Sequence, residues 1–285
     1  MAPSHYGPEQ HQVTQCNDCG MVYTNPQTTT YLEEVENRGA LERHFDPQAI
    51  RAKRDQAHFL LKLIERYSPG RSLLDFGCGI GAVVKVARES GWNAMGFDLN
   101  GGLVERANEF WGSRDLVTGN LGNFYASHQG KFDAILSFQV FEHLQQPVDT
   151  GTELVRLLRP GGVILIDVPY VYQPAEWMSR GKTLDPTSHW CHFSKRTLSD
   201  LVRRLDCEVV YCSAAPSLVG FYNKLGFGRA AASLGLLTKA CLPPIGSGVC
   251  VIGRKARDRS SLEAGGRGSE GKSSGKSLQA IANFP

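Results

Sequence analysis

The glycine-rich segment Asp75-Phe76-Gly77-Cys78-Gly79-Ile80-Gly81 has the residue types of a loop that holds a nucleotide-like ligand. Residues 72–76 before it predict a short buried strand, and residues 82–90 after it predict a helix. Glycines at such a junction let the backbone turn sharply and let a ligand approach without meeting a Cβ atom, while the helix N-terminus favours negative charge. Asp98, 21 residues after Gly77, ends the next apolar run and can accept hydrogen bonds from both hydroxyls of a ribose.

This loop and Asp98 fit more than one cofactor. Gly77-x-Gly79-x-x-Ala82 satisfies the dinucleotide pattern G-x-G-x-x-G/A, which is typical of NAD(P)-dependent oxidoreductases, and a glycine-rich turn without any ligand is a further interpretation. Asp75 favours a different cofactor. A carboxylate at this position would repel a pyrophosphate, whereas it suits the cationic amino-acid end of S-adenosylmethionine (SAM).

Alternating strands and helices position the loop. Apolar runs predict strands over 72–76, 93–98, 115–118, 132–138, 163–168, 207–212 and 249–253. Helical periodicity predicts helices over 47–67, 82–90, 103–110, 148–158 and 197–205. Continuous apolar strands alternating with helices indicate an α/β fold with a parallel sheet covered on both faces. Ligands of such sheets bind at the carboxyl ends of the strands, near the point where the strand order reverses.

Further motifs follow the glycine loop in a fixed order. They are Phe132-Asp133-Ala134-Ile135, Phe141-Glu142-His143-Leu144, and the expected helix stop Leu157-Leu158-Arg159-Pro160-Gly161-Gly162. With the D-x-G-C-G-x-G loop, these motifs make the chain from about residue 47 to 254 resemble class I SAM-dependent methyltransferases. The resemblance implies a Rossmann-like seven-stranded sheet of order 3-2-1-4-5-7-6 with strand seven antiparallel. The run 249–253 fits that last strand.

The resemblance also implies a SAM site, made of Asp75, Gly77, Gly79, Gly81, Asp98, Leu99, Asn120, Leu121 and Gln139. The first four residues would hold the methionine part, Asp98 the ribose, and Gln139 would line the methionine pocket. Leu99 would lie beside the adenine. Asn120 and Leu121 occupy the place where the family usually has an acidic residue near the adenine amino group. Asn120 departs from that pattern, although its amide oxygen can accept the same hydrogen bond.

Three histidines are candidates for a base that takes a proton from an oxygen acceptor, since histidine titrates near neutral pH. His143 follows the strand 132–138, and His189 and His192 lie in Ser188-His189-Trp190-Cys191-His192. We predict His189 as the catalytic base and His143 as the second candidate, with bracing of the following helix as the alternative for His143. We expect His192 to pack or to assist a helix cap. The aromatic residues Tyr170, Tyr172 and Trp177 wall an acceptor pocket or simply pack.

Cys16-x-x-Cys19-Gly20 resembles half of a zinc ribbon. His5 and His11 could complete a metal site, but their spacing is irregular, and the alternative is a remnant turn. The prediction is therefore no metal, with Cys16 and Cys19 kept as zinc candidates.

Composition limits the partners and the location. The chain has 285 residues, a formal net charge of +3 and 41% hydrophobic residues, which is ordinary for a globular protein. No dense Lys/Arg block favours nucleic acid, and we expect no secretory signal and no membrane span. We therefore predict a cytoplasmic protein with reduced thiols. We divide it into an irregular leader (1–46), a methyltransferase domain (47–255) with an insertion (218–246), and a disordered tail (256–285).

These observations predict an enzyme that moves a methyl group from SAM to a small-molecule acceptor. We favour an oxygen acceptor on a sugar, a phenolic or quinone-like metabolite, or a lipid or glycan precursor. The amphipathic insertion 218–246 either packs on the sheet or contacts a membrane surface peripherally. The alternatives are an NAD(P)-dependent oxidoreductase that uses the same glycine loop and a degenerate methyltransferase fold that serves as a binding subunit. The oligomeric state is not encoded in these motifs.

Overall fold

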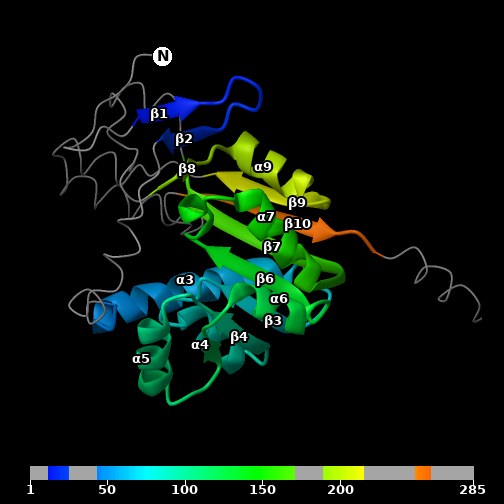
Figure 1. Cartoon of the computed structure of the whole chain (residues 1–285). Helices are drawn as coiled ribbons and strands as arrows, with labels where there is room; N and C mark the ends of the chain where they lie inside the picture. Colours follow the sequence, from blue (N-terminus) through cyan, green and yellow to red (C-terminus); the bar gives the residue numbers. More distant parts are fainter. Residues whose placement is uncertain (1–11, 26–43, 171–188, 215–247, 258–285) are drawn as a thin grey trace, which may run out of the picture.

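The computed structural model describes residues 12–25, 44–170, 189–214 and 248–257. Its main element is a seven-stranded sheet of order β5-β4-β3-β6-β7-β10-β9 (Figure 1). The strands are β3 (Ser72–Phe76), β4 (Asn93–Phe97), β5 (Leu116–Val117), β6 (Phe132–Phe138), β7 (Leu158–Pro169), β9 (Cys207–Ala214) and β10 (Gly248–Lys255). The predicted insertion 218–246 and the predicted tail from residue 258 onward lie outside the described residues.

The strand order confirms the predicted fold class. Numbered along the sheet's own chain order, it is 3-2-1-4-5-7-6. Pairs β3–β4, β3–β6, β4–β5 and β6–β7 are parallel. Strand β10 runs antiparallel to β7 on one side and to β9 on the other. The order reverses beside β3, so the loop after β3 lies at the topological switch point where such sheets bind ligands.

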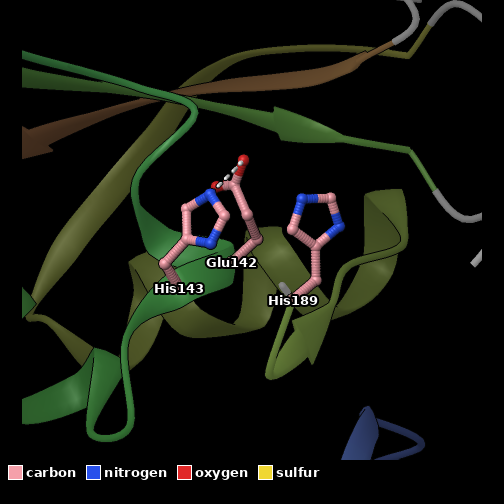
Figure 2. Close-up of side chains that lie close together, drawn as sticks. All are labelled: Glu142, His143 and His189. Atoms are coloured by element: carbon pink, nitrogen blue, oxygen red, sulfur yellow. Dashed lines mark ion pairs between the residues drawn. The ribbon is translucent and has the colours of Figure 1, made fainter. Parts of the chain in front are cut away.

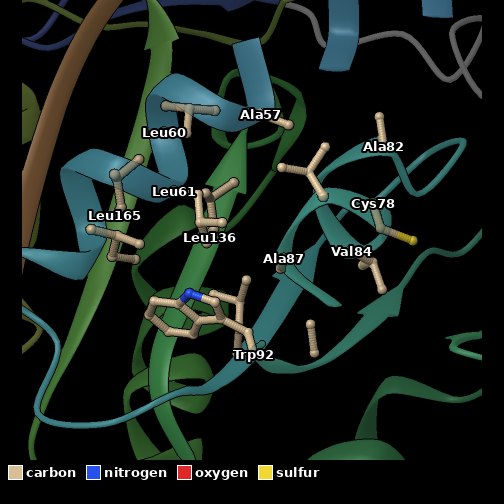
Figure 3. Close-up of a cluster of buried hydrophobic side chains, with 14 of the residues drawn as sticks. Ala57, Leu60, Leu61, Cys78, Ala82, Val84, Ala87, Trp92, Leu136 and Leu165 are labelled. Atoms are coloured by element: carbon tan, nitrogen blue, oxygen red, sulfur yellow. The ribbon is translucent and has the colours of Figure 1, made fainter. Parts of the chain in front are cut away.

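Helices cover both faces of the sheet. The helices are α3 (Pro47–Glu65), α4 (Ala82–Glu89), α5 (Gly101–Trp111), α6 (Leu121–His128), α7 (Pro147–Leu157) and α9 (Lys195–Arg204). One buried cluster joins α3, α4 and α5 to one face, and a second joins α6, α7 and α9 to the other. On the first face, Ala57, Leu60 and Leu61 of α3 pack over Leu136 and Leu165 of the sheet (Figure 3). Because helices cover both faces of the sheet, a ligand site is expected at the ends of the strands.

Two motif residues stabilise the sheet at the amino ends of its strands, away from the predicted site. The carboxylate of Asp133 accepts a hydrogen bond from the Ser72 N–H (2.9 Å) and pairs with Arg159 Nη1 (3.0 Å). The first contact joins the amino ends of β3 and β6, and the second joins those of β6 and β7. The motif residues Asp133 and Arg159 therefore stabilise the fold, and they do so away from the predicted ligand site.

The connection after α7 differs from the expectation. We expected Arg159 to Gly162 to close the helix as a loop, but α7 ends at Leu157 and these residues belong to β7. The reason is strand pairing that begins early: Leu158 already pairs with Phe132, and the register then shifts before Ala134 pairs with Val163. The irregularity absorbs the glycines without ending the strand.

The leader is not irregular at residues 12–25, contrary to the expectation. Strands β1 (Gln12–Gln15) and β2 (Val22–Asn25) form an antiparallel hairpin. Strand β2 also pairs with β8 (Cys191–His192), so the N-terminal hairpin joins a segment far along the chain (Figure 1). This pairing is invisible in local sequence patterns, because β8 is only two residues long. The domain boundaries themselves remain a prediction.

None of the helices in the described parts of the chain is both long and apolar enough to cross a membrane.

Candidate active site

The glycine loop after β3 is pinned to the end of β4. The N–H groups of Gly77 and Cys78 both donate to the Phe97 carbonyl oxygen, at 2.8 and 3.2 Å. Gly77 has a φ of +76°, and a Cβ there would lie closer than 3.0 Å to Val140 Cγ2. Gly81, with a φ of +72°, is the N-cap of α4. Glycine is required at Gly77 on both counts, since the conformation is left-handed and the neighbouring side chain fills the space.

Asp98 lies beside the open part of this loop. Its Oδ2 accepts the Gly79 N–H (2.8 Å) and its Oδ1 accepts the Asn100 N–H (2.9 Å). Each carboxylate oxygen keeps a lone pair for a further donor. A Cβ at Gly79 would meet no atom within 4 Å, and the neighbouring Leu99 side chain is 61% exposed. The open backbone, the anchored carboxylate and the exposed apolar side chain fit the ribose and the base of a nucleoside such as that of SAM.

Asp75 lies under the loop and is buried, with 3% of its surface exposed. Burial, together with the nearby Asp98 carboxylate, raises the pKa of Asp75 to about 8. In the ligand-free protein this carboxyl group therefore keeps its proton near neutral pH. A cationic ligand group beside it would favour the ionised form.

Asp75 should make the ligand-free protein less stable as the pH rises from 5 to 8. The folded pKa lies above the unfolded value, so the folded state binds the extra proton and stability falls by at most about 1.4 kcal/mol per pH unit. We expect Asp75→Asn to lack this slope. The free energy of unfolding of the variant, minus that of the wild type, should therefore increase between pH 5 and 8. Urea unfolding at several pH values measures the difference. Asp55→Asn, at an exposed position on α3, is the control. Parallel slopes for wild type and Asp75→Asn would contradict the prediction.

Asn120 and Leu121 lie at the start of α6, a helix that we did not predict. Asn120 is exposed and its side-chain oxygen caps the helix by accepting the Asn123 N–H at 3.1 Å. Leu121 is half-buried. Capping occupies one lone pair of the Asn120 oxygen, which leaves one lone pair for an adenine amino group.

Gln139 follows β6 in a strained conformation, with a φ of +56°. Its backbone N–H donates to the Asp167 carbonyl oxygen (2.8 Å), and its side chain donates to Asp167 Oδ1 (3.2 Å). Asp167 is buried at the end of β7, and burial raises its pKa to about 7. A non-glycine residue held in this region is a frequent mark of a functional site.

The structure brings both predicted base candidates together. The rings of His143 and His189 lie 4.9 Å apart between centroids, and His143 Nε2 lies 3.9 Å from Glu142 Oε1 (Figure 2). Glu142 and His143 belong to the short helix η1 (Phe141–His143), and His189 precedes β8. His192 instead pairs with Thr24 Oγ1 at 3.0 Å and is buried, as expected for a packing residue.

Glu142 lies in the same group, although it was not among the site residues predicted from the sequence. Its side chain is 1% exposed, and burial raises its pKa to about 8, with a smaller contribution from Asp167. The Glu142-His143 dipeptide alone does not indicate burial, because Glu142 is held beside the distant segment before β8, where the Trp190 N–H donates to its carbonyl. Tyr170 forms a bridge with Phe193, whereas Tyr172 and Trp177 lie outside the described residues.

Cys16 and Cys19 lie in the turn of the β1–β2 hairpin. The turn is closed by the hydrogen bonds of the Gly20 N–H to the Cys16 carbonyl and of the Cys16 N–H to the Met21 carbonyl. In the part of the chain that the structure describes, no third histidine, cysteine or acidic side chain gathers with this pair as a metal site would require. His5 and His11 lie outside the described residues.

A family model described as "Methyltransferase domain" matches residues 48–211, more than half of the chain. The chain belongs to this methyltransferase family. The assignment confirms the resemblance stated from the motifs, and with it SAM as the cofactor. It also decides against the dinucleotide interpretation of the glycine loop.

Individual relatives of this methyltransferase are distant. The 2-methyl-6-phytyl-1,4-hydroquinone methyltransferase of Synechocystis is 26% identical over 146 residues, which is 50% of this chain and 43% of that protein. The ubiquinone biosynthesis O-methyltransferase of Methylococcus capsulatus is 26% identical over 149 residues, 47% of this chain and 60% of the relative. The alignments thus leave a large part of each relative's length unmatched.

Solved structures share the fold. A SAM-dependent methyltransferase from Archaeoglobus fulgidus superposes with a TM-score of 0.50 at 17% identity, covering 71% of this chain and 94% of that chain. Identity at this level supports the architecture alone.

Proposed function

We propose that this methyltransferase transfers the methyl group of SAM to an oxygen of a small-molecule acceptor. The observation that carries the proposal is the continuity between the glycine loop and the histidine group. Val140 packs against Gly77 at one end, and two residues later Glu142 and His143 enter the group with His189. A cofactor on the loop and an acceptor beside the histidines would therefore be neighbours at the carboxyl edge of the sheet.

The residues around the loop divide the binding of SAM among them. Bound SAM supplies an electrophilic methyl group on a sulfonium sulfur. Asp98 would accept hydrogen bonds from the ribose hydroxyls with its remaining lone pairs, and Leu99 would lie beside the adenine. Asn120 and Leu121 would lie near the adenine amino group. Asp75 and Gln139 would hold the methionine part, while Gly77, Gly79 and Gly81 would keep the backbone close to the ligand.

The acceptor's proton is taken by the histidine group in this proposal. His189 is the first candidate and His143 the second. Glu142 lies next to His143 and would stabilise an imidazolium, as a carboxylate commonly does for a catalytic histidine. An oxygen acceptor requires such a base, because the hydroxyl is a poor nucleophile until its proton leaves.

The names of the two relatives favour a phenolic or quinone-like acceptor, since one is a hydroquinone methyltransferase and the other acts in ubiquinone biosynthesis. Such acceptors carry a ring hydroxyl, which suits a histidine base. Peripheral membrane contact through 218–246 and a cytoplasmic location remain predictions.

The test checks the cofactor directly and separates methyl transfer from the binding-subunit alternative. Calorimetry with SAM and with NADH comes first, and we expect SAM alone to bind; binding of NADH without SAM would contradict the proposal. Methyl-labelled SAM is then incubated with a small-molecule extract and with a panel of catechols, hydroquinones and sugars. Label in an ether product supports oxygen transfer. Binding of SAM without any transfer would favour the binding-subunit alternative.

A further inference from the structure

Glu142, His143 and His189 form a compact group of metal-ligating side chains. One nitrogen or oxygen from each lies within 4.8 Å of the others, and it is the one group of three or more such ligands among the described residues. Figure 2 shows the Glu142 carboxyl group beside the His143 ring, with the His189 ring close by. The three come from two segments that are 46 positions apart in the sequence, so the fold and not the local sequence gathers them.

The Glu142 carboxylate has no hydrogen-bond partner within the described residues. Its side chain is 1% exposed, yet both oxygens lack a partner, and the approach to His143 Nε2, at 3.9 Å, is too long for a hydrogen bond. The Asp167 side chain is 2% exposed and its Oδ2 is likewise unpartnered among the described residues. Burying such groups without compensation costs several kcal/mol. The buried Glu142 carboxyl group, with unused lone pairs beside two imidazole rings, points to a cation.

The backbone around the group is firmly held. The Trp190 N–H donates to the Glu142 carbonyl (2.8 Å), and the buried Thr24 hydroxyl donates to the His189 carbonyl (2.8 Å). Thr24 belongs to β2, so the N-terminal hairpin fixes the main chain from which the His189 side chain extends. These hydrogen bonds fix the main chain at Glu142 and His189, and so limit the positions that the two side chains can reach.

We propose that Glu142, His143 and His189 bind a divalent first-row transition metal ion. Two imidazoles and one carboxylate suit zinc, manganese, cobalt or iron, and three protein ligands leave coordination positions open. Two ligand atoms of a tetrahedral set, with bonds near 2.1 Å, lie about 3.4 Å apart. The ligand atoms lie within 4.8 Å of one another, so side-chain rotations that move each atom by about 0.7 Å would close the set.

The open positions take the oxygen of the methyl acceptor. A hydroxyl bound to a divalent cation loses its proton to water at a lower pH than a free hydroxyl, which leaves the oxygen as the nucleophile. This role rests on the proposed methyl transfer, whereas the binding of the ion does not. The metal then replaces a histidine as the activating group, and the two histidines serve as ligands.

The experiment measures metal binding directly. The full chain with Cys16→Ser and Cys19→Ser, which removes the thiols of the hairpin turn, is treated with a chelator and titrated with Co²⁺ and Zn²⁺ by calorimetry. The Co²⁺ visible spectrum is recorded in parallel. We expect one ion per chain, and at least about tenfold weaker binding after Glu142→Gln or His189→Gln. His58→Gln, at an exposed position on α3, should bind as the parent does.

Circular dichroism and SAM calorimetry on every variant show that the chain is folded. Absence of a bound ion in the parent chain, or unchanged binding after both Glu142→Gln and His189→Gln, overturns the proposal. SAM binding without metal binding would refute the metal site and leave the proposed function intact. Metal binding without SAM binding would support the metal site and refute the proposed function.

Discussion

Replacing Gly77 with alanine is expected to destabilise the protein by about 2–5 kcal/mol. About 1–2 kcal/mol comes from the left-handed conformation, since φ is +76°. The rest comes from overpacking, because the new Cβ would lie closer than 3.0 Å to Val140 Cγ2. Urea unfolding followed by circular dichroism measures the change in the free energy of unfolding.

Two further variants separate the backbone cost from the packing cost. Gly79→Ala is the matched control: its φ is +51°, but a Cβ there meets no atom within 4 Å, so it should lose only about 1–2 kcal/mol. Gly77→Ala combined with Val140→Ala should recover part of the overpacking loss relative to Gly77→Ala alone. If Gly77→Ala and Gly79→Ala were equally stable, the proximity of Val140 would have no energetic consequence. For SAM affinity the order of the two variants should reverse: Gly79→Ala should weaken binding more than Gly77→Ala, because Gly79 presents the open face of the loop.

Asp98→Ala should weaken SAM binding by about 100-fold or more. The carboxylate is anchored by the N–H groups of Gly79 and Asn100. In the proposed site its remaining lone pairs would accept hydrogen bonds from two ribose hydroxyls. Each hydrogen bond to a charged group contributes about 1.5–3 kcal/mol, and every 1.4 kcal/mol is tenfold in affinity. Calorimetric titration at fixed ionic strength measures the dissociation constant.

The control for this variant is Glu109→Ala, which makes the same charge change at an exposed position on α5. Asp98→Asn should fall between the two, because the amide keeps one acceptor oxygen but loses the charge. If Asp98→Ala weakened SAM binding by less than about threefold, the ribose would have to lie elsewhere. A circular dichroism spectrum like that of the wild type is needed, since Asp98 also holds Gly79 in place.

Most of the large sheet could be predicted from local patterns. The strands 72–76 and 132–138 were predicted with the bounds of β3 and β6, because each is a mostly apolar run bounded by polar residues or glycine. Helix α6 was missed, since Leu121–His128 buries only Phe124 fully and shows no clear apolar repeat. The extra length of β7 was missed because its glycines are compatible with either a turn or an irregular strand.

The candidate site likewise contains features that the sequence predicted and features that it did not. The glycine loop and Asp98 follow from residue spacing along one strand–turn–helix–strand unit. The meeting of His143 with His189 does not, since it depends on how β8 pairs with β2. The burial of Glu142 and the strained Gln139 were likewise beyond prediction, because neither has a local sequence signature.

The sequence by itself determined the family, the strand order implied by it, and the position of the glycine loop that we propose faces the cofactor. These depend on periodicity and short motifs, which act over neighbouring residues. Only the tertiary structure decided that the N-terminal hairpin pairs with β8 beside the candidate site, that Val140 lies against Gly77, and that a buried carboxyl group meets two histidines. Each of these is a contact between segments distant in the chain, whose partners are chosen by packing and hydrogen bonding of the whole fold.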